Sequence, residues 1–408
     1  MAWPSNRSRS SKVEPSKEQF ADLDKLAGIE VSDDFARFSQ RNDLFTRAFW
    51  DPQVQSKDTD AFFASYRIEA SPRRGDGFSH KDFALRNAAW AVSDMVSERS
   101  AATGKREGFQ APLEPTNDIC PDAHEVEDVA AFTRELKEVA RLFGADLVGV
   151  CELDERWHYS SRVDVRDFSE ADNGLPQDIT HVIVLGHGMD ASLVRSYPSA
   201  LAGAATGLEY SREASIVIQL TAYIRNLGYT AVASMNDTAL AIPYAIKAGL
   251  GEYGRNQMVI TPEFGPRVRF SKIFTSLPLE PDKPAKFGVE TYCNACTVCA
   301  DACPPKALPY GPPSFERPNQ SSLQGVKKWT ADCERCFGYW AKLKTDCAIC
   351  MRVCPFSETP GSWRGQIFRR LVHLGTLSLA RIWARRVLSL PRLKPKDWWA
   401  SLSSPTDS

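Results

Sequence analysis

The sequence predicts a mixed fold of α/β (α+β) class, in which a layered domain of helices and strands precedes a small cysteine-rich domain. Two observations support this prediction. From about residue 126, stretches with helical spacing alternate with short apolar runs, and nine of the eleven cysteines then lie within residues 293–354. The predicted parts are a disordered N-terminus (1–19), an irregular, aromatic-rich region (20–125), the layered domain (126–286), the cysteine domain (287–360) and a basic amphipathic tail (361–408).

The composition is that of an ordinary globular protein, with 43% hydrophobic and 25% charged residues and a net charge of −1. This balance argues against a protein whose main task is to bind nucleic acid. No apolar run reaches the roughly 18 residues that span a bilayer. The first residues, MAWPSNRSRSSKVEPSKEQ, contain no apolar core of a secretion signal, so we expect a cytoplasmic protein.

The layered domain is predicted from helices that alternate with strands. The segment VEDVAAFTRELKEVARLFG (126–144) has helical spacing and stops at a glycine, as does REASIVIQLTAYIRNLG (212–228). Short apolar runs predict strands at DLVGVCEL (146–153), THVIVLGHG (180–188), YTAVASM (229–235), QMVITP (257–262) and RVRFSKIFTSLP (267–278).

A glycine-rich stretch, AGLGEYGRNQ, contains Gly249, Gly251 and Gly254 in the spacing G-x-G-x-x-G. A dinucleotide-binding turn requires a strand before this motif, a helix after it and an acid about 20 residues on. Here the predicted helix comes first, the strand follows, and no acid stands at that distance. The motif therefore does not predict a nicotinamide dinucleotide site.

The spacing of the clustered cysteines is typical of iron–sulfur ligands. The first run has the pattern C-x2-C-x2-C-x3-C-P and consists of Cys293, Cys296, Cys299 and Cys303. The second run ends in another C-P and contains Cys347, Cys350 and Cys354. In two-cluster bacterial ferredoxins, three thiolates of a run hold one 4Fe–4S cluster and the fourth crosses to the other. The alternative, a zinc site, does not call for two C-P endings.

The crossing rule assigns the ligands of two 4Fe–4S clusters. Cluster one takes Cys293, Cys296, Cys299 and Cys354. Cluster two takes Cys303, Cys347, Cys350 and one further thiolate. The spacing leaves Cys333 and Cys336 both open for this last position.

Several segments, in this order, resemble the corrinoid-dependent reductive dehalogenases: LGYTAVASMND, AGLGEYGRNQMVITPEFGPRVRF, LPLEPDKP, CNACTVCADACP, VKKWTADCERCFGYW and CAICMRVCPFS. The resemblance covers about residues 126–358. It implies a nitroreductase-like corrinoid-binding domain followed by a ferredoxin-like domain with two 4Fe–4S clusters. In this family a cysteine directly precedes the aromatic of the CF..W motif, which selects Cys336 and leaves Cys333 as an extra.

The resemblance also implies where the corrinoid lies. The turn with Gly249, Gly251, Gly254 and Arg255 is expected against its nucleotide tail, because residues without side chains let backbone N–H groups approach phosphate and amide oxygens. The sequence lacks the D-x-H-x-x-G motif that presents a histidine to cobalt in other corrinoid proteins. We therefore expect a base-off corrinoid, with the lower face of cobalt free.

On the substrate side the family uses a tyrosine acid, an amide or lysine partner and an arginine. These positions fall on Tyr210, Asn236 and Arg269. Tyrosine has a pKa near 10, so a cation that stabilises the tyrosinate makes it a better proton donor. The implied activity is removal of halogen from an organohalide, with a proton donated by Tyr210.

Two rival functions stay open at this point. The first is that of the related epoxyqueuosine reductases, which act on tRNA and use an acid where the dehalogenases use tyrosine; Glu209 stands directly before Tyr210. The second is a non-catalytic two-cluster electron carrier, which does not need a layered domain with its own glycine-rich turn.

The sequence also suggests an electron donor for this protein and surfaces that bind other molecules. The chain has no flavin or nicotinamide module, so we expect a separate low-potential donor of ferredoxin or flavodoxin type and no nucleic acid partner. Aromatic residues between 35 and 90 suit either a core or a hydrophobic substrate pocket. The tail is interpreted as a solvated helix, a docking face for an acidic carrier, or a membrane-surface helix.

Overall fold

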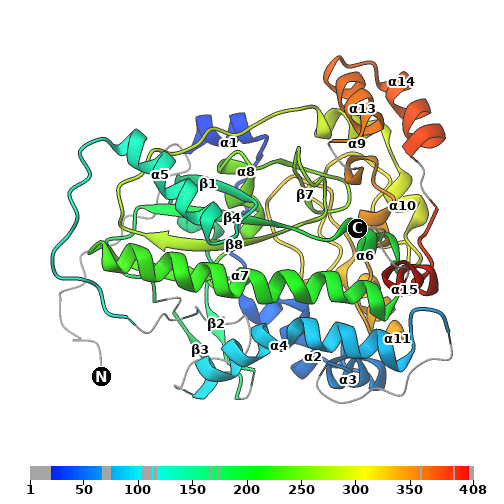
Figure 1. The fold of residues 1–408 in the computed structure, drawn as a ribbon, viewed down its shortest axis with the longest axis horizontal. Coiled ribbons are helices and arrows are strands. Elements are labelled where there is room, and N and C mark those ends of the chain that lie inside the picture. Colours follow the sequence, from blue (N-terminus) through cyan, green and yellow to red (C-terminus); the bar gives the residue numbers. More distant parts are fainter. Residues whose placement is uncertain are drawn as a thin grey trace.

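The computed structural model describes residues 20–66, 75–102, 113, 117–165, 167–172, 174–358, 361–388 and 391–403, with backbone only at 97–102. Its centre is a four-stranded sheet in the order β1 (Leu147–Glu152), β4 (His181–Gly188), β8 (Val268–Thr275) and β5 (Ala231–Ser234) (Figure 1). Every neighbouring pair in this sheet is antiparallel. The sheet is therefore that of an α+β protein, and a parallel α/β arrangement is excluded for it.

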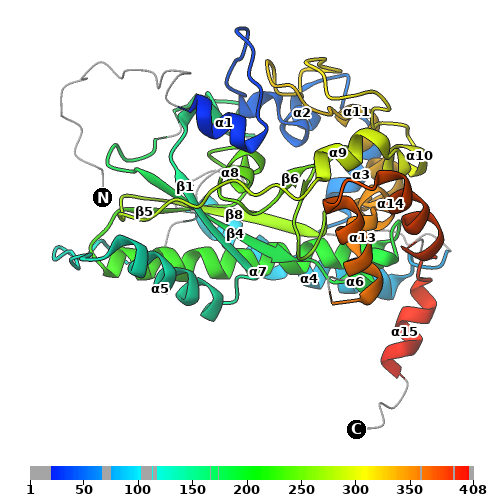
Figure 2. The same cartoon turned by 90° about the horizontal axis from the view of Figure 1, so that it is seen from above.

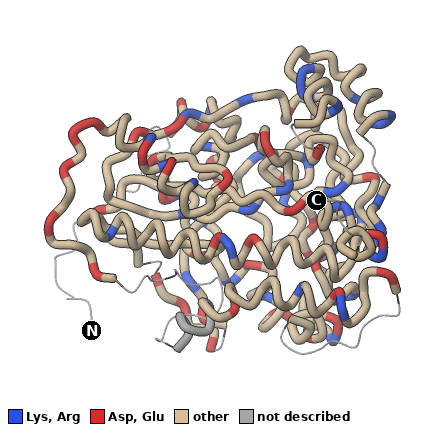
Figure 3. The backbone as a smooth tube through the Cα atoms, in the orientation of Figure 1, with Lys and Arg blue, Asp and Glu red and all other residues tan. Residues whose placement is uncertain are grey.

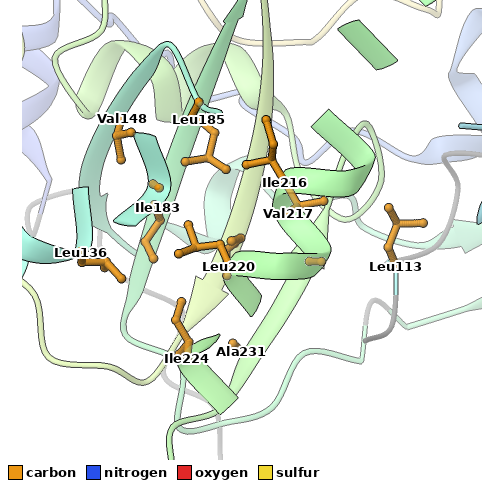
Figure 4. Packing of buried hydrophobic residues seen from close by; sticks show 14 of the residues in the cluster. Leu113, Leu136, Val148, Ile183, Leu185, Ile216, Val217, Leu220, Ile224 and Ala231 are labelled. Atoms are coloured by element: carbon orange, nitrogen blue, oxygen red, sulfur yellow. The ribbon is translucent and has the colours of Figure 1, made fainter. Parts of the chain in front are cut away.

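One face of the sheet is covered by α5 (Val129–Leu142) and α7 (Ala200–Asn226), as Figure 2 shows. Leu136 of α5 packs with Val217, Leu220 and Ile224 of α7 against Ile183 and other strand residues (Figure 4). These side chains are almost completely buried. Their spacing along α7 places them on one face of the helix, so burial of this face fixes the helix on the sheet.

Helix α7 begins earlier than its sequence predicts. The helical pattern was expected from Arg212, whereas the helix starts after Ser199, whose side chain accepts a hydrogen bond from the Ala202 amide. The additional turns are rich in alanine, which has the highest helix propensity but shows no apolar periodicity. Tyr210 consequently lies in the middle of the helix.

The opposite face of the sheet is covered by α8 (Ala241–Lys247) and, beyond it, α1 (Ala21–Ala27) (Figure 2). Two small antiparallel pairs flank this side: β2 (Arg162–Val163) with β3 (Glu170–Ala171), and β6 (Glu252–Tyr253) with β7 (Val259–Ile260). The predicted strand at 257–262 corresponds to β7. A 3-10 turn, η3 (Glu155–Trp157), follows β1.

The region 20–125 is more regular than its sequence suggested. Besides α1 it contains η1 (Gln40–Asn42), α2 (Leu44–Trp50), α3 (Lys57–Ala64) and α4 (His80–Ala102). Helix α4 lies along α7, and α3 packs against α11 of the cysteine region. The region therefore bridges the sheet domain and the cysteine domain. The predicted disorder of residues 1–19 lies outside the described residues.

The cysteine region and the tail are helical. In chain order the elements are α9 (Val289–Ala295), α10 (Val298–Ala302), α11 (Cys333–Leu343), α12 (Ile349–Arg352), η4 (Pro355–Ser357), α13 (Trp363–His373), α14 (Leu377–Trp383), a π-helical turn η5 (Ala384–Leu388) and α15 (Pro395–Ser403). A short helix, α6 (Ala191–Arg195), precedes α7. Among the described residues, no helix combines the length and apolar character that a membrane span requires.

Candidate active site

A cavity of about 1360 Å³ lies where the sheet domain, the helices of region 20–125 and the cysteine region meet. Residues from each of these parts line it, among them Tyr159, Tyr210, Trp340 and Cys333. Pockets for drug-sized ligands usually measure about 300–1,000 Å³. The cavity is therefore large enough for a cofactor together with a substrate.

Tyr210, Asn236 and Arg269 come together at the wall of this cavity. The Asn236 Nδ2 group donates a hydrogen bond of 2.5 Å to the Tyr210 hydroxyl. The Arg269 guanidinium lies over the Tyr210 ring, 3.6 Å from its centroid, and Trp90 is stacked on the ring at 4.6 Å. Asn236 and Arg269, which the resemblance singled out, thus both contact Tyr210.

The sheet topology explains this convergence. Strands β5 and β8 are antiparallel, with Ser234 opposite Lys272, so the residues after β5 lie beside the first residues of β8. Asn236 belongs to the former group and Arg269 to the latter. Helix α7 crosses the sheet at this end and brings Tyr210 onto them.

The environment of Tyr210 favours a protonated hydroxyl next to groups that stabilise its anion. Burial raises the pKa of Tyr210, while Arg269 and the hydrogen bond from Asn236 lower it, and Glu213 raises it further. The phenol is thus a neutral donor at rest. When it gives up its proton, the Asn236 amide and the Arg269 guanidinium are already in place to stabilise the tyrosinate.

Glu209, the residue that would support the rival function, does not line the cavity. Its carboxylate lies 3.5 Å from the Arg212 guanidinium, which also forms an ion pair with Asp146 at 2.9 Å. One helical position is a rotation of about 100°, so adjacent residues of α7 face different neighbours. The geometry therefore favours Tyr210 over Glu209 as the residue that meets a ligand.

The packing of the predicted cluster ligands agrees with the crossing pattern in part. Cys293, Cys296 and Cys354 pack in one buried cluster, and Cys303, Cys336 and Cys350 pack in another, which also includes Cys299. The pKa of Cys354 is raised by burial and by the neighbouring thiols of Cys293, Cys299 and Cys296. The pKa of Cys350 is raised by burial and by the thiols of Cys336, Cys347, Cys299 and Cys303.

No group of three or more His, Cys, Asp or Glu side chains in the described part of the chain lies close enough to hold a single metal ion. The ligands of a 4Fe–4S cluster bind separate irons, whereas zinc gathers four ligands about one ion. Burial raises the pKa of Cys293 and of Cys299 to about 12. Without a bound cation, burial thus favours the protonated thiols at these two positions.

Cys333 and Cys336 occupy different surroundings on α11. Cys333 lines the cavity, and its sulfur lies 3.8 Å from the Gln257 side-chain amide. Cys336 packs with Cys303, and its pKa is raised by burial and by Cys347 and other neighbouring thiols. This placement supports Cys336 as the remaining ligand of cluster two.

The glycine-rich turn has a packing role. A Cβ atom on Gly249 would lie 2.5 Å from the Lys283 carbonyl oxygen, and one on Gly251 would lie 2.4 Å from that of Ile260. At Gly254 a Cβ would lie 2.7 Å from the Ile260 side chain. The residues of the turn that line the cavity are Glu252, Tyr253 and Gln257. Direct contact of the three glycines with a cofactor stays a prediction.

Arg255 is buried, and its guanidinium donates hydrogen bonds to main-chain carbonyls of the cysteine region, including those of Cys293, Cys296 and Pro309. It does not belong to the cavity wall. The side chain joins the turn to the first cysteine loop. Its predicted contact with the cofactor therefore has no support in this geometry.

One buried acid at this site, Glu213, was not predicted from the sequence. Glu213 lies one turn after Tyr210 on α7, has no exposed surface, and neither of its carboxyl oxygens has a hydrogen-bond partner among the described residues. The sequence did contain a signal. Glu213 precedes Val217, Leu220 and Ile224 on the apolar face of a predicted helix, where an acid is unusual.

Comparison with known proteins agrees with this architecture. Residues 163–279 match the family model described as reductive dehalogenase subunit, and residues 292–357 match the 4Fe-4S double cluster binding domain. Tetrachloroethene reductive dehalogenase of Sulfurospirillum multivorans is 37% identical over 256 residues, covering 57% of this chain and 51% of that protein. The enzyme of the same name from Desulfitobacterium hafniense is 33% identical over 358 residues, covering 72% and 65%.

Among solved structures, a catabolic reductive dehalogenase shares the fold, with a TM-score of 0.64 and 20% identity, over 88% of this chain and 46% of that one. Epoxyqueuosine reductase of Lactococcus garvieae matches over 33% of this chain. The chain belongs to the reductive dehalogenase family. It combines the dehalogenase domain of that family with a domain that binds two 4Fe–4S clusters, and it spans between half and two thirds of the length of the two tetrachloroethene reductive dehalogenases named above.

Proposed function

We propose that this protein removes halogen from an organohalide as halide, using a base-off corrinoid, electrons relayed through two 4Fe–4S clusters, and a proton from Tyr210. The observation that carries the proposal is the convergence of Tyr210, Asn236 and Arg269 on one large cavity whose wall also includes residues of the cysteine region. In this proposal, residues 126–286 form a nitroreductase-like domain that binds the corrinoid, and residues 287–360 form a ferredoxin-like domain.

The cavity fits a corrinoid by its size and its polar groups. A corrinoid carries peripheral amides and a phosphate in its nucleotide tail. Lys286, Lys328 and Gln257 line the wall, and the buried indole N–H groups of Trp157 and Trp340 have no hydrogen-bond partner among the described residues. These donors suit amide and phosphate oxygens. When bound there, the corrinoid would supply low-potential electrons to the carbon–halogen bond.

The aromatic residues of the wall fit a hydrophobic organohalide. The aromatic side chains of region 20–125 that line the cavity are Phe38, Phe45, Phe49, Phe62, Phe63, Tyr66 and Trp90. They give this part of the cavity an apolar, aromatic lining. Tyr210 would hold the substrate carbon within reach of its hydroxyl and donate the proton that replaces the halogen.

The clusters would connect an external donor with the cavity. Cys333 and Asn294 line the wall, and they lie in the same helices as the cluster ligands Cys336 and Cys293. An electron carrier without a catalytic role would not need a cavity of this size. The placement of Glu209 outside the cavity disfavours the tRNA-modifying function.

The helices α13 and α14 offer a docking face for the donor. Phe368 and Val372 of α13 pack into the same buried cluster as Cys293, Cys296 and Cys354 of cluster one. The segment 363–388 contains no acid, and its basic residues mark the corner of the molecule that this helical pair forms (Figure 3). Acidic ferredoxins and flavodoxins would be attracted to this corner.

Reversing three exposed arginines of this face, Arg381, Arg385 and Arg386, to glutamate is expected to slow turnover with a protein donor. Turnover with a small chemical reductant should stay unchanged, and the wild-type rate with the protein donor should fall as salt rises. Arg134→Glu on the exposed face of α5 is the matched control. Equal losses with both reductants would show a structural role, and binding of wild-type protein to anionic vesicles would favour the membrane-surface alternative.

The experiment that tests the proposed function is halide release from organohalides by anaerobically reconstituted protein, with and without bound corrinoid. We expect release to require the corrinoid.

A further inference from the structure

Helix α7 carries a buried acid at a position that otherwise belongs to the apolar core. Glu213 follows Tyr210 by three residues and precedes Val217 by four, so all three share one face of the helix. Tyr210 and Val217 belong to the buried apolar cluster between α7 and the sheet. A carboxyl in this place is costly when charged, and it has no hydrogen-bond partner among the described residues.

The charged groups around Glu213 come from two elements. Arg269 and Lys272 of β8 favour its ionised form, whereas Glu209, one turn earlier on α7, opposes it. Burial outweighs both effects and raises the pKa of Glu213 to about 7. His187 of β4 lies opposite Arg269 in the sheet; burial lowers its pKa to about 3, so it is neutral.

Glu209 links this interior to solvent. Burial raises its pKa to about 7 as well, against the effect of Arg212. The Arg212 and Asp146 side chains, which form an ion pair, are 38% and 26% exposed. Glu209 thus interacts with the partly exposed Arg212 and with Glu213, and Glu213 in turn acts on Tyr210.

We propose that Glu213 is a proton store that returns a proton to Tyr210 after each turnover, and that Glu209 reloads it from the Arg212–Asp146 end. The proposal rests on the proposed function, because it requires that Tyr210 gives up a proton. Arg269 serves both partners. It lies on the Tyr210 ring and acts on Glu213, so it stabilises the tyrosinate and then the carboxylate.

The step moves one proton and no electron. After Tyr210 has given its proton to the substrate carbon, the O–H bond of the Glu213 carboxyl breaks and an O–H bond forms on the tyrosinate oxygen. The resulting Glu213 carboxylate takes a proton from Glu209, which is reprotonated by water. Two acids with pKa values near neutrality are matched to this exchange at neutral pH.

The test compares Glu213→Gln with wild-type holoenzyme in two kinetic regimes. The first turnover should proceed at the wild-type rate, because Tyr210 starts with its own proton. Steady-state kcat should fall by on the order of 10²-fold, with KM unchanged. Wild-type kcat should decline as the pH rises through about 7, where Glu213 loses its proton, and this decline should be absent in the variant.

Infrared pH-difference spectra supply a readout independent of turnover. The wild-type protein should show a protonated carboxyl that titrates near neutral pH and is missing in Glu213→Gln. Glu213→Asp should retain part of kcat, and Glu135→Gln on the exposed face of α5 should behave like wild type. An unchanged kcat in Glu213→Gln, or equal loss of its first turnover, would overturn the proton store. Absence of halide release by the wild-type protein would instead refute the proposed function.

Discussion

Replacing Tyr210 by phenylalanine is expected to abolish most halide release while corrinoid and both clusters stay bound. The substitution removes the donatable proton and keeps the ring that packs between Trp90 and Arg269. Loss of a general acid lowers turnover by about 10²–10⁴-fold. The measurement is kcat for anaerobic halide release, normalised to cobalt and iron content.

Tyr223→Phe is the matched control for this prediction. Tyr223 lies on the same helix, packs against the same core, and does not line the cavity, so its phenylalanine variant should keep full activity. Near-normal dehalogenation by Tyr210→Phe would remove this residue from the mechanism. Activity of the wild type on an epoxide-bearing tRNA that is lost in Glu209→Gln would favour the rival function.

Replacing Cys336 by serine is expected to remove one of the two clusters. Two 4Fe–4S clusters give about eight irons per chain, and loss of cluster two leaves about four. Cys336 packs with Cys303 and lies near Cys347, so its loss leaves this cluster without one of its four thiolates. Turnover should disappear with it, because the relay is interrupted. Iron analysis and the visible spectrum of anaerobic protein measure the effect.

Cys333→Ser provides the control on the same helix. Its sulfur faces Gln257 and the cavity, so the serine variant should keep about eight irons. Iron that is lost in Cys333→Ser and retained in Cys336→Ser would reverse the ligand assignment.

Local sequence patterns predicted the helices that bury one face and the strands that are buried on both faces. The helix over 129–142 and the strands around 147–152, 181–188 and 268–275 were recognised because apolar residues recur with the period that each structure requires. The cysteine spacing likewise predicted a domain with two 4Fe–4S clusters, because ligand spacing is a local property, while the assignment of single cysteines to each cluster stays a prediction. The helices of region 20–125 were missed, because they bury their aromatics against α7 and α11 rather than showing a strong period of their own.

The site itself depends on contacts between distant residues. The resemblance singled out Tyr210, Asn236 and Arg269, but their meeting follows from the antiparallel pairing of β5 with β8 and the crossing of α7, which no local pattern encodes. The same is true of Arg255, which looked like a cofactor ligand and binds carbonyls of the cysteine region. The sequence also did not predict what the glycine-rich turn packs against. A G-x-G-x-x-G motif occurs wherever the backbone comes close to another group, whether that group is a cofactor or another part of the chain.

The most direct test of the central claim is halide released per electron pair as a function of cobalt bound per chain. Protein with about eight irons is prepared anaerobically with graded amounts of corrinoid and reduced in the presence of an organohalide. The account predicts one halide for every two electrons, a rate proportional to bound cobalt up to about one per chain, and none without corrinoid. Protein that holds both clusters and accepts electrons, yet binds no corrinoid and releases no halide, would contradict it.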